Sequence, residues 1–121
     1  MGLSQLSTIF YFGKATENFS RFKTIGLINT SSEDMLITDS AAGATAFATG
    51  LKSYNGAISV DMNELPLKNM TEQLDPQNIS TGLVATSGIT HATPACFYAH
   101  AAKRSMKDTI AFQLPDSGVE F

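Results

Sequence analysis

Ser40 has the best setting for nucleophilic chemistry in this sequence. It follows Asp39 and precedes a run of small residues, 41–46, where a helix is expected to begin at the serine. The first turn of a helix has unpaired backbone N–H groups and a positive dipole end, which favour an anion such as phosphate or an ionised hydroxyl. The alternative is that Ser40 only caps an alanine-rich helix. Asp39 also has two interpretations, as a base or partner of a cation, or as a helix cap or a charge that complements the dipole.

Other side chains could bind an anion or a metal. Arg104 could hold a phosphate through two parallel hydrogen bonds, or stabilise the C-terminus of a helix. Thr93, directly before a proline, could cap a helix or face a hard cation such as Mg²⁺. The spacing of His91 and His100 fits neither paired zinc ligands on a helix nor a zinc finger. We therefore expect no metal site made from these two histidines alone.

The composition indicates one small globular domain. The chain has 121 residues, of which 43% are hydrophobic, and a formal net charge of −3. This composition argues against a disordered tail, which has fewer apolar residues, and against a nucleic-acid-binding module, which needs a basic face. Cys96 is the single cysteine, so no intrachain disulfide can form, and we interpret it as a small buried residue. No apolar run approaches the about 18 residues of a membrane span, and the first residues do not have the pattern of a signal peptide.

Hydrophobic periodicity and turn residues predict helices that alternate with strands, which is typical of an α/β fold with a mostly parallel sheet. The Asn55-Gly56 pair predicts a turn. The expected helices cover residues 2–12, 41–50, a short segment from Pro66, 94–105 and 107–114, and the expected strands cover residues 22–29, 81–86 and 119–121.

Long segments of the sequence resemble the alkaline phosphatase family. Residues 37–52, ITDSAAGATAFATGLK, are similar to the segment that carries that family's nucleophile, and residues 54–58, YNGAI, continue the similarity. Residues 81–104, TGLVATSGITHATPACFYAHAAKR, resemble the family's segment with metal-binding residues and an arginine. Residues 1–5 resemble the segment directly after the family's first metal-binding aspartate. These segments occur in the family's order through nearly the whole chain.

The resemblance implies a role for each candidate residue. Ser40 would be the nucleophile, which forms a covalent phosphoserine and contacts a zinc ion as an alkoxide. Arg104 would grip two oxygens of the transferred phosphoryl group, and Asp39 would orient Arg104. Thr93 would be a ligand of a magnesium ion, and His91 would lie near that magnesium without ligating it.

The resemblance also implies a fold and partners. Residues 1–121 would be part of a single catalytic domain, a partial three-layer α/β/α sandwich without its first strand and its C-terminal half. The complete enzyme would hold two zinc ions and one magnesium ion, cleave phosphate monoesters, release inorganic phosphate, form a homodimer and act in the periplasm or outside the cell. We expect the 121 residues alone neither to bind two zinc ions nor to turn over substrate, because most zinc ligands would come from elsewhere.

Two alternatives stay open. The chain could be an inactive fragment that binds phosphate at Ser40 or docks on a partner chain through an exposed sheet edge. It could also be a metal-free serine hydrolase in which Ser40 works with His91 or His100, although the G-x-S-x-G motif of lipase-type hydrolases is absent around Ser40.

Overall fold

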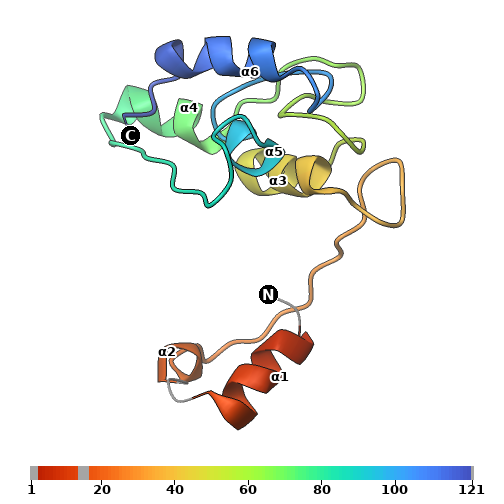
Figure 1. Ribbon diagram of the computed structural model, residues 1–121, viewed down its shortest axis with the longest axis vertical. Coiled ribbons are helices and arrows are strands. Elements are labelled where there is room, and N and C mark those ends of the chain that lie inside the picture. Colours follow the sequence, from red (N-terminus) through yellow and green to blue (C-terminus); the bar gives the residue numbers. More distant parts are fainter. Residues whose placement is uncertain (1–2, 14–16, 121) are drawn as a thin grey trace.

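The computed structural model describes residues 3–13 and 17–120, and the regular structure within these ranges is helical. The α-helices are α1 (Leu3–Phe12), α2 (Glu17–Ser20), α3 (Ser40–Thr49), α4 (Met70–Leu74), α5 (Ala92–Ala95) and α6 (Lys107–Gln113), and the 3-10 turns η1 (Asp75–Gln77) and η2 (Leu114–Asp116) follow α4 and α6. Helices α1 and α2 lie apart from the other helices, at the end of a long extended segment (Figure 1). Parts of two expected segments, residues 1–2 and residue 121, lie outside the described residues.

The expected parallel sheet, and with it the α/β/α sandwich, is wrong for the part of the chain that the structure describes. Residues 22–29 and 81–86 run without regular structure instead of pairing as strands. A strand needs neighbours that pair its backbone and cover its side chains. Residues 23–30 make no backbone hydrogen bond to another described segment, and Ile25 and Val84 are 95% and 101% exposed. The expected last strand makes one such bond, from Glu120 N to Thr81 O.

Helix α3, which carries Ser40, forms for local reasons and confirms the expected helix. The Asp39 side chain caps its start, its sequence is rich in alanine, and Gly50 ends it in the left-handed conformation, with a φ of 77°. Only small side chains line its buried face: Ala41, Ala42, Ala44, Thr45 and Ala48. This face lets α5 pack closely against α3.

The other helix predictions had mixed outcomes. The last helix is confirmed as α6, but the helix expected from Pro66 begins instead at Met70. Asn69 starts α4 because its side chain accepts a hydrogen bond from Glu72 N, while the Glu72 side chain accepts one from Asn69 N. The helix expected over residues 94–105 is wrong beyond α5, because the chain turns after Ala95 and Ala101 then pairs with Ile58 in an isolated antiparallel bridge.

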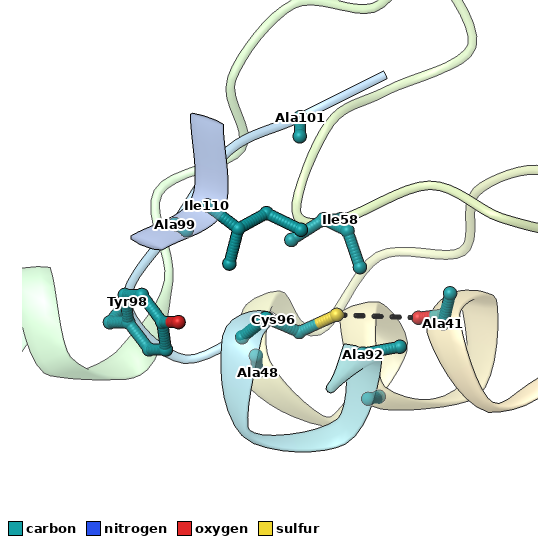
Figure 2. Close-up of a cluster of buried hydrophobic side chains, with 11 residues drawn as sticks. Ala41, Ala48, Ile58, Ala92, Cys96, Tyr98, Ala99, Ala101 and Ile110 are labelled. Atoms are coloured by element: carbon teal, nitrogen blue, oxygen red, sulfur yellow. Dashed lines mark hydrogen bonds between the residues drawn. The ribbon is translucent and has the colours of Figure 1, made fainter. Parts of the chain in front are cut away.

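A small core joins α3, α5 and α6 (Figure 2). Alanines of α3 and α5 surround Ile58, Cys96 and Ile110, none of which is accessible to solvent. The Cys96 Sγ lies 3.4 Å from Thr45 Oγ1 and 3.5 Å from Ala41 O, which confirms that Cys96 is a buried residue. Burial raises the pKa of the Cys96 thiol more than the contacts with Thr45 and Ser59 lower it. The core therefore holds the first turn of α3 in place through groups that stay neutral.

Candidate functional site

Ser40 is the first residue of α3, and its side chain is exposed. Its Oγ accepts a hydrogen bond of 2.8 Å from Nη1 of Arg104, which lies 64 residues later in the chain. A cation so close to a hydroxyl favours the ionised form of that hydroxyl. The structure therefore brings a potential nucleophile and a phosphate-binding group together at an exposed helix N-terminus.

Arg104 reaches Ser40 from an irregular segment and not from a helix end. Its backbone N–H donates to Gly56 O at 2.8 Å, which fixes where the side chain starts. Its Nη1 also donates to Asp39 Oδ2 at 3.0 Å. Among the described residues, Nε and Nη2 have no hydrogen-bond partner, so they can bind two oxygens of an incoming anion. The alternative role for Arg104, stabilising a helix C-terminus, is wrong because α5 ends well before it.

Asp39 is both the cap of α3 and the partner of Arg104. Its Oδ1 accepts hydrogen bonds from Ala41 N at 3.0 Å and Ala42 N at 2.9 Å, while Oδ2 faces Arg104. Burial alone would raise the pKa of Asp39, but the hydrogen bonds from Ala42 and Arg104, the amide of Gly56 and the charge of Arg104 outweigh it and hold this pKa below its usual value of 3.8. Asp39 thus occupies two of the helix amides expected to attract an external anion, and Arg104 is left as the main anion-binding group.

Thr93 and His91 lie on the neighbouring segment. Thr93 is the second residue of α5 and His91 directly precedes that helix, so Thr93 does not cap it as one interpretation expected. Both side chains are exposed. Helices α3 and α5 pack together, but within the described residues neither side chain forms a hydrogen bond with Ser40 or Arg104.

His100 lies in a different contact network. Its Nδ1 is 2.7 Å from Ser59 O and its Nε2 is 2.9 Å from Glu72 Oε1. Both ring nitrogens are thus engaged, and Ser40 forms no hydrogen bond with a histidine among residues 3–13 and 17–120. A serine–histidine pair of the hydrolase type is therefore not formed in the described chain.

The donor set near Ser40 does not by itself fit a zinc or magnesium ion. The described residues contain no group of three or more His, Cys, Asp or Glu side chains that could hold a metal. Structural and catalytic zinc sites need at least three protein ligands. Asp39, the acidic side chain next to Ser40, is already shared between Arg104 and the helix amides. A metal at Ser40 would need ligands that the described residues do not supply.

Asn55, which the sequence marks only as half of a turn, lies beside the site. Its Oδ1 accepts a hydrogen bond of 2.8 Å from Asp39 N, and its Nδ2 donates to Ile37 O at 2.9 Å. The continuation of the family-like segment through residues 54–58 was the available signal. A turn alone needs only the Asn55-Gly56 pair, so a similarity that extends over residues 54–58 could have indicated a further role for Asn55.

A family model described as alkaline phosphatase matches residues 7–120 of this chain. Alkaline phosphatase 4 of Bacillus subtilis is 44% identical over 107 residues, which are 88% of this chain and 23% of that relative. The solved alkaline phosphatase of the Antarctic bacterium TAB5 has a TM-score of 0.94 and 52% identity over 99% of this chain and 35% of its own.

A second TAB5 structure, of a mutant with Mg bound in its M3 site, matches with a TM-score of 0.94 and 50% identity, covering 100% of this chain and 35% of its own. This chain therefore spans about a third or less of the length of these relatives. In the described part of the chain, no helix is both long and apolar enough to cross a membrane.

Proposed function

The chain belongs to the alkaline phosphatase family, and on this basis we propose that it supplies the nucleophile and the phosphate-binding arginine for the hydrolysis of phosphate monoesters. One observation carries the proposal: Ser40 Oγ and Arg104 Nη1 lie 2.8 Å apart at an exposed helix N-terminus. Phosphoryl transfer asks mainly for positioning of the reacting groups and for charge stabilisation around the equatorial oxygens. An arginine beside a serine meets both needs.

In the proposed reaction, Ser40 Oγ attacks the phosphorus atom, and its proton passes to solvent as the new O–P bond forms. The bond between phosphorus and the ester oxygen breaks, and this oxygen takes up a proton from solvent and leaves as the alcohol. The oxygen of a water molecule then bonds to phosphorus, the bond between phosphorus and Ser40 Oγ breaks, Ser40 Oγ takes back a proton, and inorganic phosphate is released. The positive charge of Arg104 favours ionised Ser40 in the first step, and its Nε and Nη2 groups bind the phosphoryl oxygens in both steps.

Asp39 positions Arg104 in this proposal. Its Oδ2 holds Nη1 of the guanidinium, while its Oδ1 is fixed by two amides of α3. The guanidinium and the nucleophile are therefore tied to the same helix turn. A shared support of this kind keeps two reacting groups at a constant separation.

Metal dependence belongs to the proposal as a property of the family. Thr93 and His91 are our candidates for the neighbourhood of a magnesium ion, and Ser40 is our candidate contact for zinc, with other ligands completing both sites. We expect two zinc ions and one magnesium ion in the active enzyme, a homodimeric assembly, and a location in the periplasm or outside the cell.

The test is hydrolysis of p-nitrophenyl phosphate by the expressed protein, which is the product of the complete reading frame. Ser40→Ala should lower kcat/KM by roughly 10³-fold or more, because the nucleophile is lost. Ser80→Ala, which removes another exposed serine hydroxyl, should keep the wild-type value. Equal activity of the two variants would contradict the proposal. Phosphate binding by the wild-type protein without any turnover would instead support the alternative of an inactive phosphate-binding chain.

A further inference from the structure

The turn formed by residues 54–57 contacts both halves of the candidate site. Ala57 N donates to Tyr54 O at 3.2 Å, which closes the turn, and Gly56 has a φ of 95°, a conformation that favours glycine. This turn lies between Ser40 and Arg104 in sequence but is far from both along the chain. Its contacts with the site are therefore tertiary contacts.

The first set of contacts holds the backbone directly before Ser40. The Asn55 side chain accepts from Asp39 N and donates to Ile37 O, so one amide group satisfies two backbone groups of the segment that leads into α3. The Asn55 backbone N–H also donates to Asp34 Oδ1 at 3.1 Å. The Ile37 side chain is 83% exposed, so packing contributes little to the position of this segment. The hydrogen bonds of Asn55 therefore fix this segment together with the contacts of the Asp39 carboxylate.

The second set of contacts holds the backbone that carries Arg104. Gly56 O accepts from Arg104 N at 2.8 Å, and Tyr54 Oη donates to Ala102 O at 2.8 Å. The next residue pair, Ile58 and Ala101, exchanges two backbone hydrogen bonds of 3.0 Å. The turn is thus bonded to the arginine segment through Gly56 O and the Tyr54 hydroxyl, and to the serine segment through the side chain and the backbone N–H of Asn55.

We propose that Asn55 is a positioning residue, which sets the separation of Ser40 and Arg104 by clamping the backbone at Ile37 and Asp39 to the turn that holds the Arg104 segment. This inference rests on the proposed function. Without the Asn55 amide, the carboxylate of Asp39 still caps α3 and Asn55 N still donates to Asp34 Oδ1, but Asp39 N and Ile37 O lose their hydrogen bonds to the turn. A misplacement of about 1 Å between reacting groups lowers rates by roughly 10²-fold.

The test uses Asn55→Ala and Asn55→Asp in the expressed protein, with Asn63→Ala, at another exposed loop asparagine, as the control. Asn55→Ala should lower kcat for p-nitrophenyl phosphate by about 10 to 10²-fold while KM changes much less, because the serine is misplaced in the transition state. Asn55→Asp keeps an acceptor for Asp39 N but places a carboxylate oxygen against Ile37 O, where two acceptors repel each other, so its kcat should also fall below that of the wild type. Far-UV circular dichroism and the melting temperature report whether each variant is folded.

A purely structural role for Asn55 would lower the melting temperature and leave kcat of the folded enzyme unchanged, and this result would overturn the proposal. A kcat loss no greater than that of Asn63→Ala would also overturn it. If the wild-type protein is inactive, the proposed function fails, and binding of inorganic phosphate decides the role of Asn55. Phosphate should then bind about tenfold more weakly to Asn55→Ala, whereas equal affinity, or no binding by the wild type, would overturn the inference.

Discussion

Two substitutions of Asp39 distinguish the role of its carboxylate as a helix cap from its role in the ion pair with Arg104. Asp39→Ala removes both the cap of α3 and the ion pair with Arg104, whereas Asp39→Asn keeps an oxygen that can accept from Ala41 N and Ala42 N. Loss of an N-cap costs about 0.5 to 2 kcal/mol. The ion pair contributes about 0.2 to 1 kcal/mol, because the Asp39 and Arg104 side chains are 29% and 36% exposed and solvent screens the pair.

The free energy of unfolding of the expressed protein, measured by urea titration at neutral pH, should therefore fall by about 1 to 3 kcal/mol in Asp39→Ala and by less than about 1 kcal/mol in Asp39→Asn. Asn69→Ala, which removes the cap of α4, is the matched control: it should destabilise the protein while leaving the ion pair between Asp39 and Arg104 intact. An equal loss of stability in Asp39→Asn and Asp39→Ala would refute the assignment of Asp39 as a cap.

The difference in unfolding free energy between the wild type and Asp39→Asn should depend on pH with a definite sign. Because the pKa of Asp39 in the folded protein lies below its usual value of 3.8, ionised Asp39 stabilises the folded state above that pH. This contribution is lost as the pH falls through the lower pKa of the folded state. The stability difference between wild type and Asp39→Asn should thus be constant near neutral pH and shrink below about pH 4. A difference that grows on acidification would contradict the reasoning.

The site and the core support three further predictions. Arg104→Ala should lower kcat/KM for p-nitrophenyl phosphate by roughly 10²-fold, and Arg104→Lys should restore only part of the lost activity because an ammonium cannot form two parallel hydrogen bonds. The control Lys103→Ala should keep a kcat/KM near the wild-type value, and a similar loss in this control would contradict the specific role of Arg104. The Cys96 thiol should react with a thiol reagent only after denaturation, because it is fully buried and its pKa is raised by burial; rapid labelling at pH 8 in the native protein would show that the core is open. The 121 residues alone, supplied with zinc and magnesium, should show no turnover, because the described residues offer no cluster of three metal-binding side chains; turnover abolished by Ser40→Ala would overturn this prediction.

Local signals were enough to predict the element that carries the nucleophile. The Asp39 cap, the alanine-rich run and Gly50 act within a few residues of one another, so α3 could be predicted closely. Helix α6 could be predicted equally well from its sequence. Helix propensity failed after Ala95, where the pairing of Ala101 with Ile58 draws the chain out of the helix.

Strands could not be judged in the same way, because pairing depends on residues distant in sequence. Residues 22–29 have the alternation and branched side chains of a strand, and residues 81–86 have the apolar run of a buried strand. In the described chain, however, no partner strand pairs with either segment. The roles that the family resemblance implies for Ser40 and Arg104 require the two residues to lie close together, whereas spacing alone does not bring residues 64 positions apart together. The family-like match through residues 54–58 marks the region of Asn55, but the contacts of Asn55 with Asp39 and Ile37 depend on side-chain geometry that this match does not describe.

Covalent trapping tests most directly whether Ser40 is the nucleophile. The expressed protein is mixed with p-nitrophenyl phosphate, quenched in acid during turnover, digested and analysed by mass spectrometry. We predict one phosphate on the peptide that contains Ser40, none on the peptide that contains Ser80, and no phosphopeptide in Ser40→Ala. Turnover with phosphate on another residue, or undiminished turnover by Ser40→Ala, would contradict the assignment of Ser40 as the nucleophile.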